Sequence, residues 1–466
     1  MTRRWSGACP PVSPAAAGSS RRFQLGANIP PPPGMSRVAR QPLLQVDAPT
    51  RSLVATVILL ILVAGTCYNA LLGIVNAHVA GIGTAVVAAT EALILAAGFI
   101  TILTSGRRPI DLPGFLILAL FLVDALYVSL ASGVPTIAMA RNGAIIALFL
   151  MLGARIDETT LKRCFLLCAV LVFAVLLLDA FAVKSYAQLF APSLYFERTR
   201  GVTPFELDEL GLFRNALGFS ERFSISNLSD HRTSSLFLEQ VSLANFSTIL
   251  VIYLTAMWQR LPRWPRLFYI VLIVFILLSN NSRTGLSLAL IAPAIYWIAP
   301  RLNRFTPLLV MPIILIIAAI VAMSLPLRYD DTMSGRIGLT MRALESADLP
   351  AMLGQSAPLA IQFSDSGYAF LIYSMSLAGL VLMWLIMSLI LALPGAVQRR
   401  CALLMSLYMF GNLLIGGNAV FTIKIAALQW LLVGFLRREG LEPPAVLDVA
   451  LAPARQSPRF ASARPL

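Results

Sequence analysis

Long apolar stretches alternate with short polar connections along most of the chain. About twelve of these stretches approach the roughly 20 residues that an α-helix needs to cross a hydrocarbon layer. They run approximately over 53–74, 84–104, 112–131, 135–153, 164–183, 236–257, 266–280, 284–299, 306–325, 367–393, 401–416 and 418–436. Because a helix satisfies its own backbone hydrogen bonds inside lipid, the pattern predicts an all-α, polytopic integral membrane protein with about twelve transmembrane helices.

Composition supports a membrane protein and argues against several functional classes. The 466 residues are 58% hydrophobic and only 12% charged, and the mean hydropathy is +0.80. The net charge of +14 comes from basic residues spread over short connections and tails, so we expect no nucleic-acid surface. The five cysteines form no pair in a polar loop, and there are only two histidines. We therefore expect no disulfide framework, no metal site and no cofactor.

The two ends of the chain lack the apolar pattern. Residues 1–50 are rich in Arg, Pro, Ser and Ala and are predicted to form a disordered, basic cytoplasmic tail, within which Met35 is an alternative start. Residues 439–466 are predicted to form a second disordered cytoplasmic tail. The membrane-embedded domain is expected to span 51–438.

Every second connection between apolar stretches is basic, and this alternation predicts the orientation. Lys and Arg in short loops remain on the cytoplasmic side. The basic connections contain Arg107 and Arg108; Arg155, Lys162 and Arg163; Arg260, Arg263 and Arg266; Arg301 and Arg304; Arg399 and Arg400; and Arg437 and Arg438. Both termini are therefore expected in the cytoplasm, and the long loops, about 184–235 and 326–366, on the extracytoplasmic side.

Both long loops are predicted to contain short helices. Pro204 opens a segment in which Phe205, Leu210, Phe213 and Leu217 share a helical stripe. In the second loop, Ser334 is predicted to cap a helix that runs to about Ala347.

Six ionisable residues fall inside the predicted spans, and all lie within roughly 10 Å of the extracytoplasmic edge at 1.5 Å of rise per residue. They are Glu91, Asp124, Arg141, Asp179, Glu239 and Lys424. Intramembrane charges seek partners or a wet cavity, so their one-sided clustering predicts a polar cavity on the outer side. The alternative is a set of structural ion pairs, Arg141 with Asp124 or Asp179 and Lys424 with Glu91.

Four outer segments contain candidate site residues. In chain order, the first segment contains His231, Arg232 and Glu239, and the second contains Arg283, in the only basic short outer connection. The third contains Arg336 and Arg342, and the fourth contains Asp365 and Tyr368. Salt bridges, a solvated helix face, a helix cap or core packing are alternative explanations for the individual residues. Several arginines together favour an anionic ligand, and the forked guanidinium donors match phosphate or pyrophosphate well. On the outer side such a ligand would be carried by a lipid.

The order of these segments resembles the Wzy-type polysaccharide polymerases, including exopolysaccharide polymerases of the xanthan type, which share a superfamily with the O-antigen ligases. The resemblance covers roughly 194–435 and rests on R-x-S-S-x-F-x-E from Arg232 to Glu239, on SNNSRTGLSLALI, on D-x-x-x-S-G-R from Asp330 to Arg336, and on DSGY followed by LAGL. Two positions depart from the pattern. Gln240 replaces the usual proline, and Asp365 stands where the ligases have histidine, which favours polymerase over ligase.

The resemblance implies a metal-independent glycosyltransferase of the bacterial inner membrane that polymerises undecaprenyl-pyrophosphate-linked repeat units on the periplasmic face. It implies that Arg232, Arg283 and Arg336 stabilise the charge on the departing pyrophosphate. It also implies that Asp365 or Glu239 is the base, and Glu239 is in addition a candidate partner of Arg232. His231, Arg342, Tyr368, Arg141 and Lys424 are expected to bind substrate, with Tyr195 as a further stacking candidate.

Three alternatives and several partners follow from the same observations. The alternatives are an O-antigen-type ligase, a twelve-helix transporter or flippase of lipid-linked oligosaccharide, and a non-catalytic scaffold. The expected partners are the lipid-linked oligosaccharide and the bilayer, together with a chain-length regulator and a flippase.

Overall fold

A computed structural model describes residues 48–106, 108–203, 210–213, 216, 228–324, 333–363, 365–416 and 418–441. The chain divides into two units, Met1–Asp47 and Ala48–Leu466, and every described residue belongs to the second unit. Most of the predicted tails, 1–50 and 439–466, and most of the helix predicted from Pro204 lie outside the described residues.

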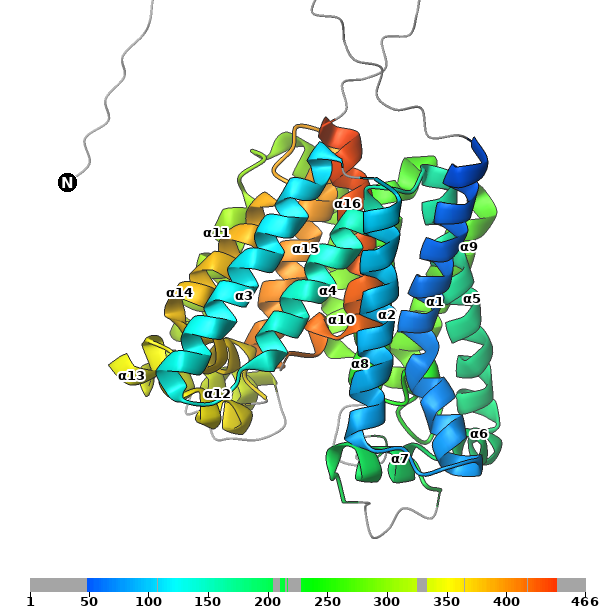
Figure 1. Cartoon of the computed structure of the whole chain (residues 1–466), viewed down its shortest axis with the longest axis horizontal. Helices are drawn as coiled ribbons and strands as arrows, with labels where there is room; N and C mark the ends of the chain where they lie inside the picture. Colours follow the sequence, from blue (N-terminus) through cyan, green and yellow to red (C-terminus); the bar gives the residue numbers. More distant parts are fainter. Residues whose placement is uncertain are drawn as a thin grey trace, which may run out of the picture. The chain divides into compact units, whose positions relative to one another are not determined.

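All regular elements in the described ranges are helices (Figure 1). The α-helices are α1 (Ala48–His78), α2 (Thr84–Thr104), α3 (Leu112–Ser132), α4 (Ile137–Gly153), α5 (Glu158–Phe181), α6 (Val183–Phe190), α7 (Pro192–Arg200), α8 (Gln240–Met257), α9 (Arg263–Asn280), α10 (Arg283–Ile298), α11 (Pro307–Ser324), α12 (Met333–Glu345), α13 (Leu349–Met352), α14 (Gly367–Leu389), α15 (Ala396–Ile415) and α16 (Ile423–Leu441). The 3-10 helices are η1 (Pro109–Asp111), η3 (Ser235–Phe237), η4 (Trp258–Arg260), η5 (Ala299–Arg301), η6 (Ala357–Phe363) and η7 (Asn418–Phe421).

Eight helices within the described residues are long and apolar enough to cross a membrane. They are α1, α2, α3, α5, α8 with its extension η4, α9, α11 and α14, and α4 is a shorter apolar helix. The prediction of a helical, membrane-embedded protein is confirmed. Each of the twelve predicted stretches overlaps one α-helix, whereas the number of crossings stays a prediction.

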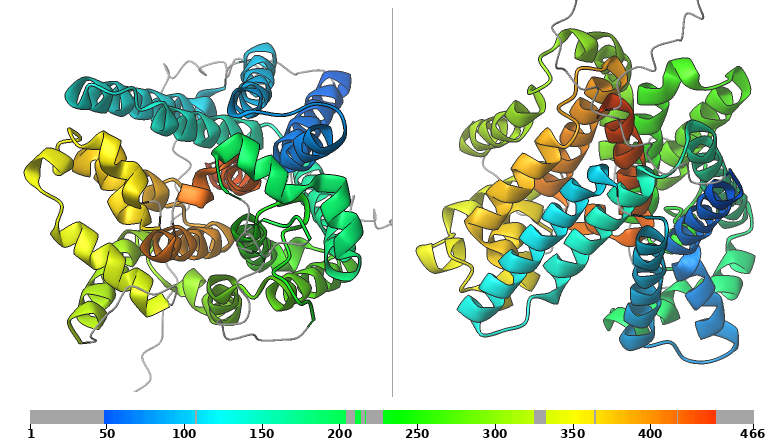
Figure 2. Two further views of the ribbon diagram at one scale, coloured as in Figure 1. Left: turned by 90° about the horizontal axis from the view of Figure 1, so that it is seen from below. Right: turned by 45° about the horizontal axis from the view of Figure 1, so that its top comes forward.

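Helices α4, α8 and α16 form the interior of the bundle. Nearly every residue of α16 from Ile423 to Leu436 is buried, and α8 is buried along most of its length. Figure 2 shows α16 enclosed by its neighbours, among which α4, α8 and α15 contact it. Gly153 of α4 and Gly434 of α16 allow the closest approach, since a Cβ at either glycine would collide with a carbonyl of the other helix. Small residues permit such backbone contact between apolar helices.

Short helices fill the parts of both long loops that the structure describes. Helices α6 and α7 follow α5, and a left-handed residue, Ala191 with φ of 39°, separates them. The helix predicted from Ser334 is present as α12, which begins one residue earlier, at Met333. Helices α6, α7 and α12 lie at one end of the bundle, and the α2–α3 connection lies at the other end (Figure 1).

Candidate functional site

Three of the predicted arginines line one cavity, called here the arginine cavity. It has a volume of about 160 Å³. Its lining residues are Arg232, Val241, Ala244, Asn245, Asn281, Ser282, Arg283, Thr284, Met333, Arg336, Asn412, Ile415 and Gly416. These described residues include three cations and no carboxylate, so the cavity is suited to a ligand with more than one negative charge.

The tight turn between α9 and α10 presents Arg283 to this cavity. Asn281 ends α9 with a left-handed φ of 54°, and its backbone N–H donates to the carbonyl of Leu277 at 3.1 Å. Asparagine tolerates this conformation better than most residues. The Ser282 hydroxyl then caps α10 by accepting from the Gly285 N–H at 3.2 Å. Arg283 is consequently the first residue of α10, exposed beside the N–H groups of the first turn, which also favour an anion.

Hydrogen bonds to the end of α9 hold Arg232. Its Nε donates to the carbonyl oxygen of Asn280 at 2.9 Å. The Asn280 amide in turn donates to the carbonyls of Thr233 at 2.6 Å and Gln240 at 2.9 Å. The segment that precedes α8 is therefore fixed to the end of α9, and both segments contribute an arginine, Arg232 and Arg283, to the cavity.

Helix α12 brings Arg336 to the same cavity. One guanidinium nitrogen of Arg336 donates to the Ile415 carbonyl at 2.8 Å, and the Thr340 hydroxyl donates to the Leu414 carbonyl at 2.8 Å. Both contacts anchor α12 on the end of α15. Arg342, six residues further along α12, is exposed, and its Nε donates to the Gly338 carbonyl at 3.2 Å. Arg342 does not line the arginine cavity, which fits the 240° of helical rotation between the two arginines.

A second cavity, called here the charged cavity, is lined by three of the six intramembrane ionisable residues, Glu91, Arg141 and Lys424. It has a volume of about 340 Å³. It is lined by Tyr68, Asn69, Thr84, Val87, Ala88, Glu91, Arg141, Tyr195, Phe196, Thr199, Arg200, Thr422 and Lys424. Arg141 and Lys424, both predicted to bind substrate, are therefore brought together here with Tyr195.

The ion pairs around the charged cavity differ from the pairs expected from sequence. Arg141 binds Glu91 at 2.6 Å, and the Tyr68 hydroxyl donates to the same carboxylate at 2.5 Å. Lys424 binds Glu239 at 2.7 Å, and Arg200 binds it at 3.0 Å. Glu239 is thus paired with two cations of the charged cavity, and the expected pairing with Arg232 is replaced.

Arg200, which we did not predict, lies at the end of α7. Its guanidinium stacks over the Phe196 ring at 4.5 Å. Desolvation lowers the pKa of Arg200, and the neighbouring Glu239 carboxylate raises it. The carboxylate has the larger effect, so the pKa of Arg200 is raised and the side chain stays a cation. Tyr195, Phe196 and Thr199 are buried on one face of α7. Their spacing in the sequence is a helical one, and it could have predicted a short helix that ends at Arg200.

His231 is buried in a structural network and lines neither cavity. Its Nε2 lies 2.8 Å from an Asp179 carboxylate oxygen, and its Nδ1 lies 3.0 Å from the Ser229 hydroxyl. The other Asp179 oxygen accepts from the backbone N–H groups of Ser234 at 2.7 Å and Ser235 at 2.9 Å. This network fixes the segment before α8, in which His231 directly precedes Arg232.

The remaining predicted residues lie outside both cavities. Asp365 is exposed just before α14, and the cap of α14 is Ser366, whose hydroxyl accepts from the Ala369 N–H at 3.4 Å. Tyr368 is completely buried, and its hydroxyl donates to the Phe410 carbonyl at 2.9 Å. Neither Asp365 nor Glu239 lines the arginine cavity, so the structure separates both predicted bases from the arginines.

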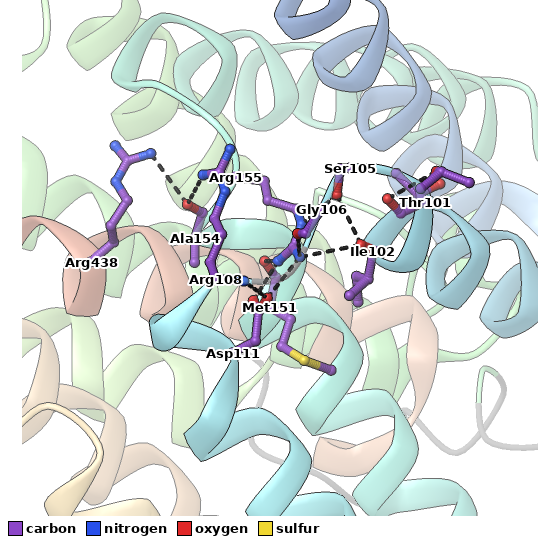
Figure 3. Close-up of polar contacts among 11 residues, drawn as sticks. Thr101, Ile102, Ser105, Gly106, Arg108, Asp111, Met151, Ala154, Arg155 and Arg438 are labelled. Atoms are coloured by element: carbon purple, nitrogen blue, oxygen red, sulfur yellow. Dashed lines mark hydrogen bonds and ion pairs between the residues drawn. The ribbon is translucent and has the colours of Figure 1, made fainter. Parts of the chain in front are cut away.

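A third arginine-rich region lies at the α2–α3 connection, at the other end of the bundle (Figure 1), where sequence predicted only a basic connection. Figure 3 shows its polar contacts. Arg155 binds both carboxylate oxygens of Asp111, at 2.5 and 2.9 Å, and its Nε donates to the Ser105 hydroxyl at 2.7 Å. It also donates to the carbonyls of Ile102, Gly106 and Met151. Arg108 and Arg438 both donate to the Ala154 carbonyl at 3.3 Å. This Arg155 cluster joins the ends of α2, α4 and α16.

No group of three or more His, Cys, Asp or Glu side chains suitable for a metal ion occurs among the described residues. Comparisons of the chain with protein-family models, curated proteins and solved structures find no match.

Proposed function

We propose that the protein is a polymerase of lipid-linked polysaccharide, with the arginine cavity as the site that binds pyrophosphate. The observation that carries the proposal is the convergence of Arg232, Arg283 and Arg336 from three separate segments on one cavity. A pyrophosphate diester carries two negative charges and presents several oxygens to forked guanidinium donors. The order of motifs along the chain supports the same substrate.

We further propose that twelve helices cross the bacterial inner membrane, with both termini in the cytoplasm and the arginine cavity on the periplasmic side. Support comes from the alternation of basic connections and from their distribution in the fold. The Arg155 cluster, in a basic connection, and α12, in a long loop, lie at opposite ends of the bundle. Positive residues of short loops are retained in the cytoplasm.

In the proposed reaction, a growing glycan leaves its lipid pyrophosphate and joins a sugar hydroxyl of the next repeat unit. The bond between the anomeric carbon and the pyrophosphate oxygen breaks, and its electron pair passes to that oxygen. The three arginines would stabilise the charge that develops there. The acceptor oxygen bonds to the anomeric carbon and releases its proton.

We assign that proton to the departing pyrophosphate. The described lining residues of the arginine cavity contain amides and hydroxyls, including Asn245, Asn281 and Asn412, and no carboxylate. A leaving-group oxygen that gains charge as the bond breaks is a suitable base beside the acceptor hydroxyl. Glu239 and Asp365, the bases expected from sequence, are tested against this assignment by amide substitution.

The decisive experiment combines purified full-length protein with a synthetic undecaprenyl-pyrophosphate oligosaccharide in detergent or nanodiscs. A ladder of elongated products, read by gel or mass spectrometry, is expected. A single transfer to a different acceptor would indicate a ligase, and transport across a vesicle without new bonds would indicate a transporter. Product formation that continues in the presence of a chelator is expected if arginines alone stabilise the leaving group.

Partner proteins would act outside this minimal reaction. A flippase would supply the lipid-linked repeat unit, and a chain-length regulator would set where elongation stops. We therefore expect the isolated protein to give products of broad length distribution, which a regulator would narrow.

A further inference from the structure

The charged cavity differs from the arginine cavity in the balance of its charges. Around it lie three cations, Arg141, Arg200 and Lys424, and two carboxylates, Glu91 and Glu239. Arg141 and Glu91 neutralise each other as one close pair. Glu239 faces two cations, so this side of the cavity has one positive charge in excess.

The excess charge is available to a ligand at Arg200. The Lys424 side chain is only 1% exposed, whereas the Arg200 side chain is 42% exposed. Of the five N–H donors of Arg200, two are directed at the Glu239 carboxylate, at 3.0 and 3.5 Å. The guanidinium therefore retains donors for a second carboxylate in the space that it lines.

The rest of the lining combines aromatic side chains with a few polar groups, as small-molecule sites do. Tyr195 and Phe196 form an aromatic pair, with ring centroids 5.2 Å apart, at one side of the cavity. Thr84 and Thr199 lie close to them, joined by a hydrogen bond of 2.8 Å from the Thr84 hydroxyl to the Thr199 carbonyl. A volume of about 340 Å³ is within the range of small-molecule sites.

The two cavities are neighbours in the fold. Gly416 lines the arginine cavity and Thr422 lines the charged cavity, and both belong to the short connection between α15 and α16. Glu239, which pairs with Arg200, is followed after one residue by Val241, which lines the arginine cavity. A glycan whose pyrophosphate lies in the arginine cavity would therefore have sugar residues near the charged cavity.

From this arrangement we infer that the charged cavity is a sugar subsite that prefers a sugar unit with one carboxylate, such as a uronic acid. Arg200 binds that carboxylate. The inference rests on the proposed function where it takes the sugar to be part of a polymerase substrate. Binding of the sugar can be measured without catalysis. A single carboxylate matches the single excess charge. A neutral sugar would leave the exposed donors of Arg200 to water.

The test measures binding of a free glucuronic-acid-containing disaccharide and of its carboxyl-reduced, neutral counterpart to the purified full-length protein by calorimetry. We expect the acidic disaccharide to bind about 10- to 100-fold more tightly, the usual contribution of hydrogen bonds to a charged group. Arg200→Gln should remove this preference, so that the acidic and the neutral disaccharide bind with similar affinity. Arg200→Lys should keep part of the preference, because it retains the charge and loses the fork.

The matched control is Arg198→Gln, which removes the same charge two residues away. Arg198 lies on α7, donates to the Asn76 side chain at 3.1 Å and does not line the charged cavity. The acid preference should survive in this variant. The inference is overturned if neither disaccharide binds, if Arg200→Gln keeps the preference while folded, or if Arg198→Gln loses it equally.

Lipid-linked forms of the two disaccharides separate this inference from the proposed function. If free acid binds selectively but no lipid-linked form is elongated, the subsite stands and the polymerase proposal fails. If both lipid-linked forms are elongated equally well and the free acid shows no preference, the polymerase stands and the subsite inference fails.

Discussion

The Arg155 cluster and the arginine cavity both gather arginines at the ends of helices, but they use them differently. In the Arg155 cluster, the protein itself supplies acceptors to every nitrogen of one guanidinium, and the Arg155 and Asp111 side chains are 0% and 3% exposed. In the arginine cavity, Arg283 is exposed, and within the described residues its side chain has no hydrogen bond or ion pair.

The difference is the one expected between arginines that hold a fold together and arginines that are proposed to bind a ligand. A buried arginine is stable only when its donors meet acceptors, because desolvation of an unpaired charge is costly. The Arg155 cluster meets this condition with one carboxylate and several carbonyls at helix ends, which would otherwise lack partners. The described lining of the arginine cavity combines its three cations with amides and hydroxyls and contains no carboxylate.

The largest expected effect is on stability, from Asp111→Ala. This change leaves Arg155 buried without its carboxylate, and breaking a buried pair in this way costs about 3–5 kcal/mol. We expect a marked loss of folded protein, measured as monodisperse protein after heating in detergent. Glu158→Ala is the control, because Glu158 pairs with Lys162 and Arg260 where its side chain is 38% exposed, and such pairs contribute about 0–1 kcal/mol. Equal losses from both changes would contradict a structural role specific to the Arg155 cluster.

The next effect is on activity, from Arg283→Ala. Loss of one preorganised donor to a developing oxyanion typically lowers a rate by about 10²–10³-fold. We expect this fall in glycosyl transfer from the lipid-linked donor. Thermal stability should be unchanged, because the Arg283 side chain is exposed. Arg342→Ala is the control, since Arg342 is also an exposed arginine near this end but does not line the cavity. Normal product length in Arg283→Ala would remove the pyrophosphate assignment.

Glu239→Gln tests a carboxylate that pairs with one buried cation and one exposed cation. Glu239 faces Lys424, buried like Arg155, and Arg200, exposed like Arg283. The amide keeps an acceptor for Lys424 but loses the charge, so we expect about 1.5–3 kcal/mol of destabilisation, the contribution of a charged hydrogen bond. Activity per folded molecule should persist, because Glu239 positions two cations and does not line the arginine cavity. Transfer at background level in folded Glu239→Gln would instead identify Glu239 as the base, and Glu197→Gln, an exposed change on α7, is the control.

Sequence predicted the parts of this architecture that depend on local pattern. The apolar stretches gave every long helix, because the requirement for internal backbone hydrogen bonding in lipid leaves few alternatives. The candidates Arg232, Arg283 and Arg336 were chosen by loop position and motif order, and they share a cavity. Arg283 in particular was singled out because it breaks the charge alternation of the short connections.

Contacts between distant segments could not be predicted in the same way. Arg200 and Glu239 are 39 positions apart, and Arg155 and Asp111 are 44 apart. Hydropathy shows that a charge lies near a helix end, but pairing depends on how helices pack and on the course of loop helices such as α7. The Glu91–Arg141 and Glu239–Lys424 pairs therefore replaced the partners that sequence position alone suggested.

The smallest effect is expected from Asp365→Asn, although sequence made Asp365 a candidate base. Its side chain is exposed and outside both cavities, and Ser366, not Asp365, caps α14. Substitution of one exposed side chain typically changes stability by about 0.5 kcal/mol or less. We expect transfer rates within about twofold of the unmodified protein, since in the proposed reaction the departing pyrophosphate takes the proton. Initial rates measured across a range of pH provide the check. A folded Asp365→Asn protein without transfer activity would place the base at Asp365 and require α14 to approach the arginine cavity when substrate binds.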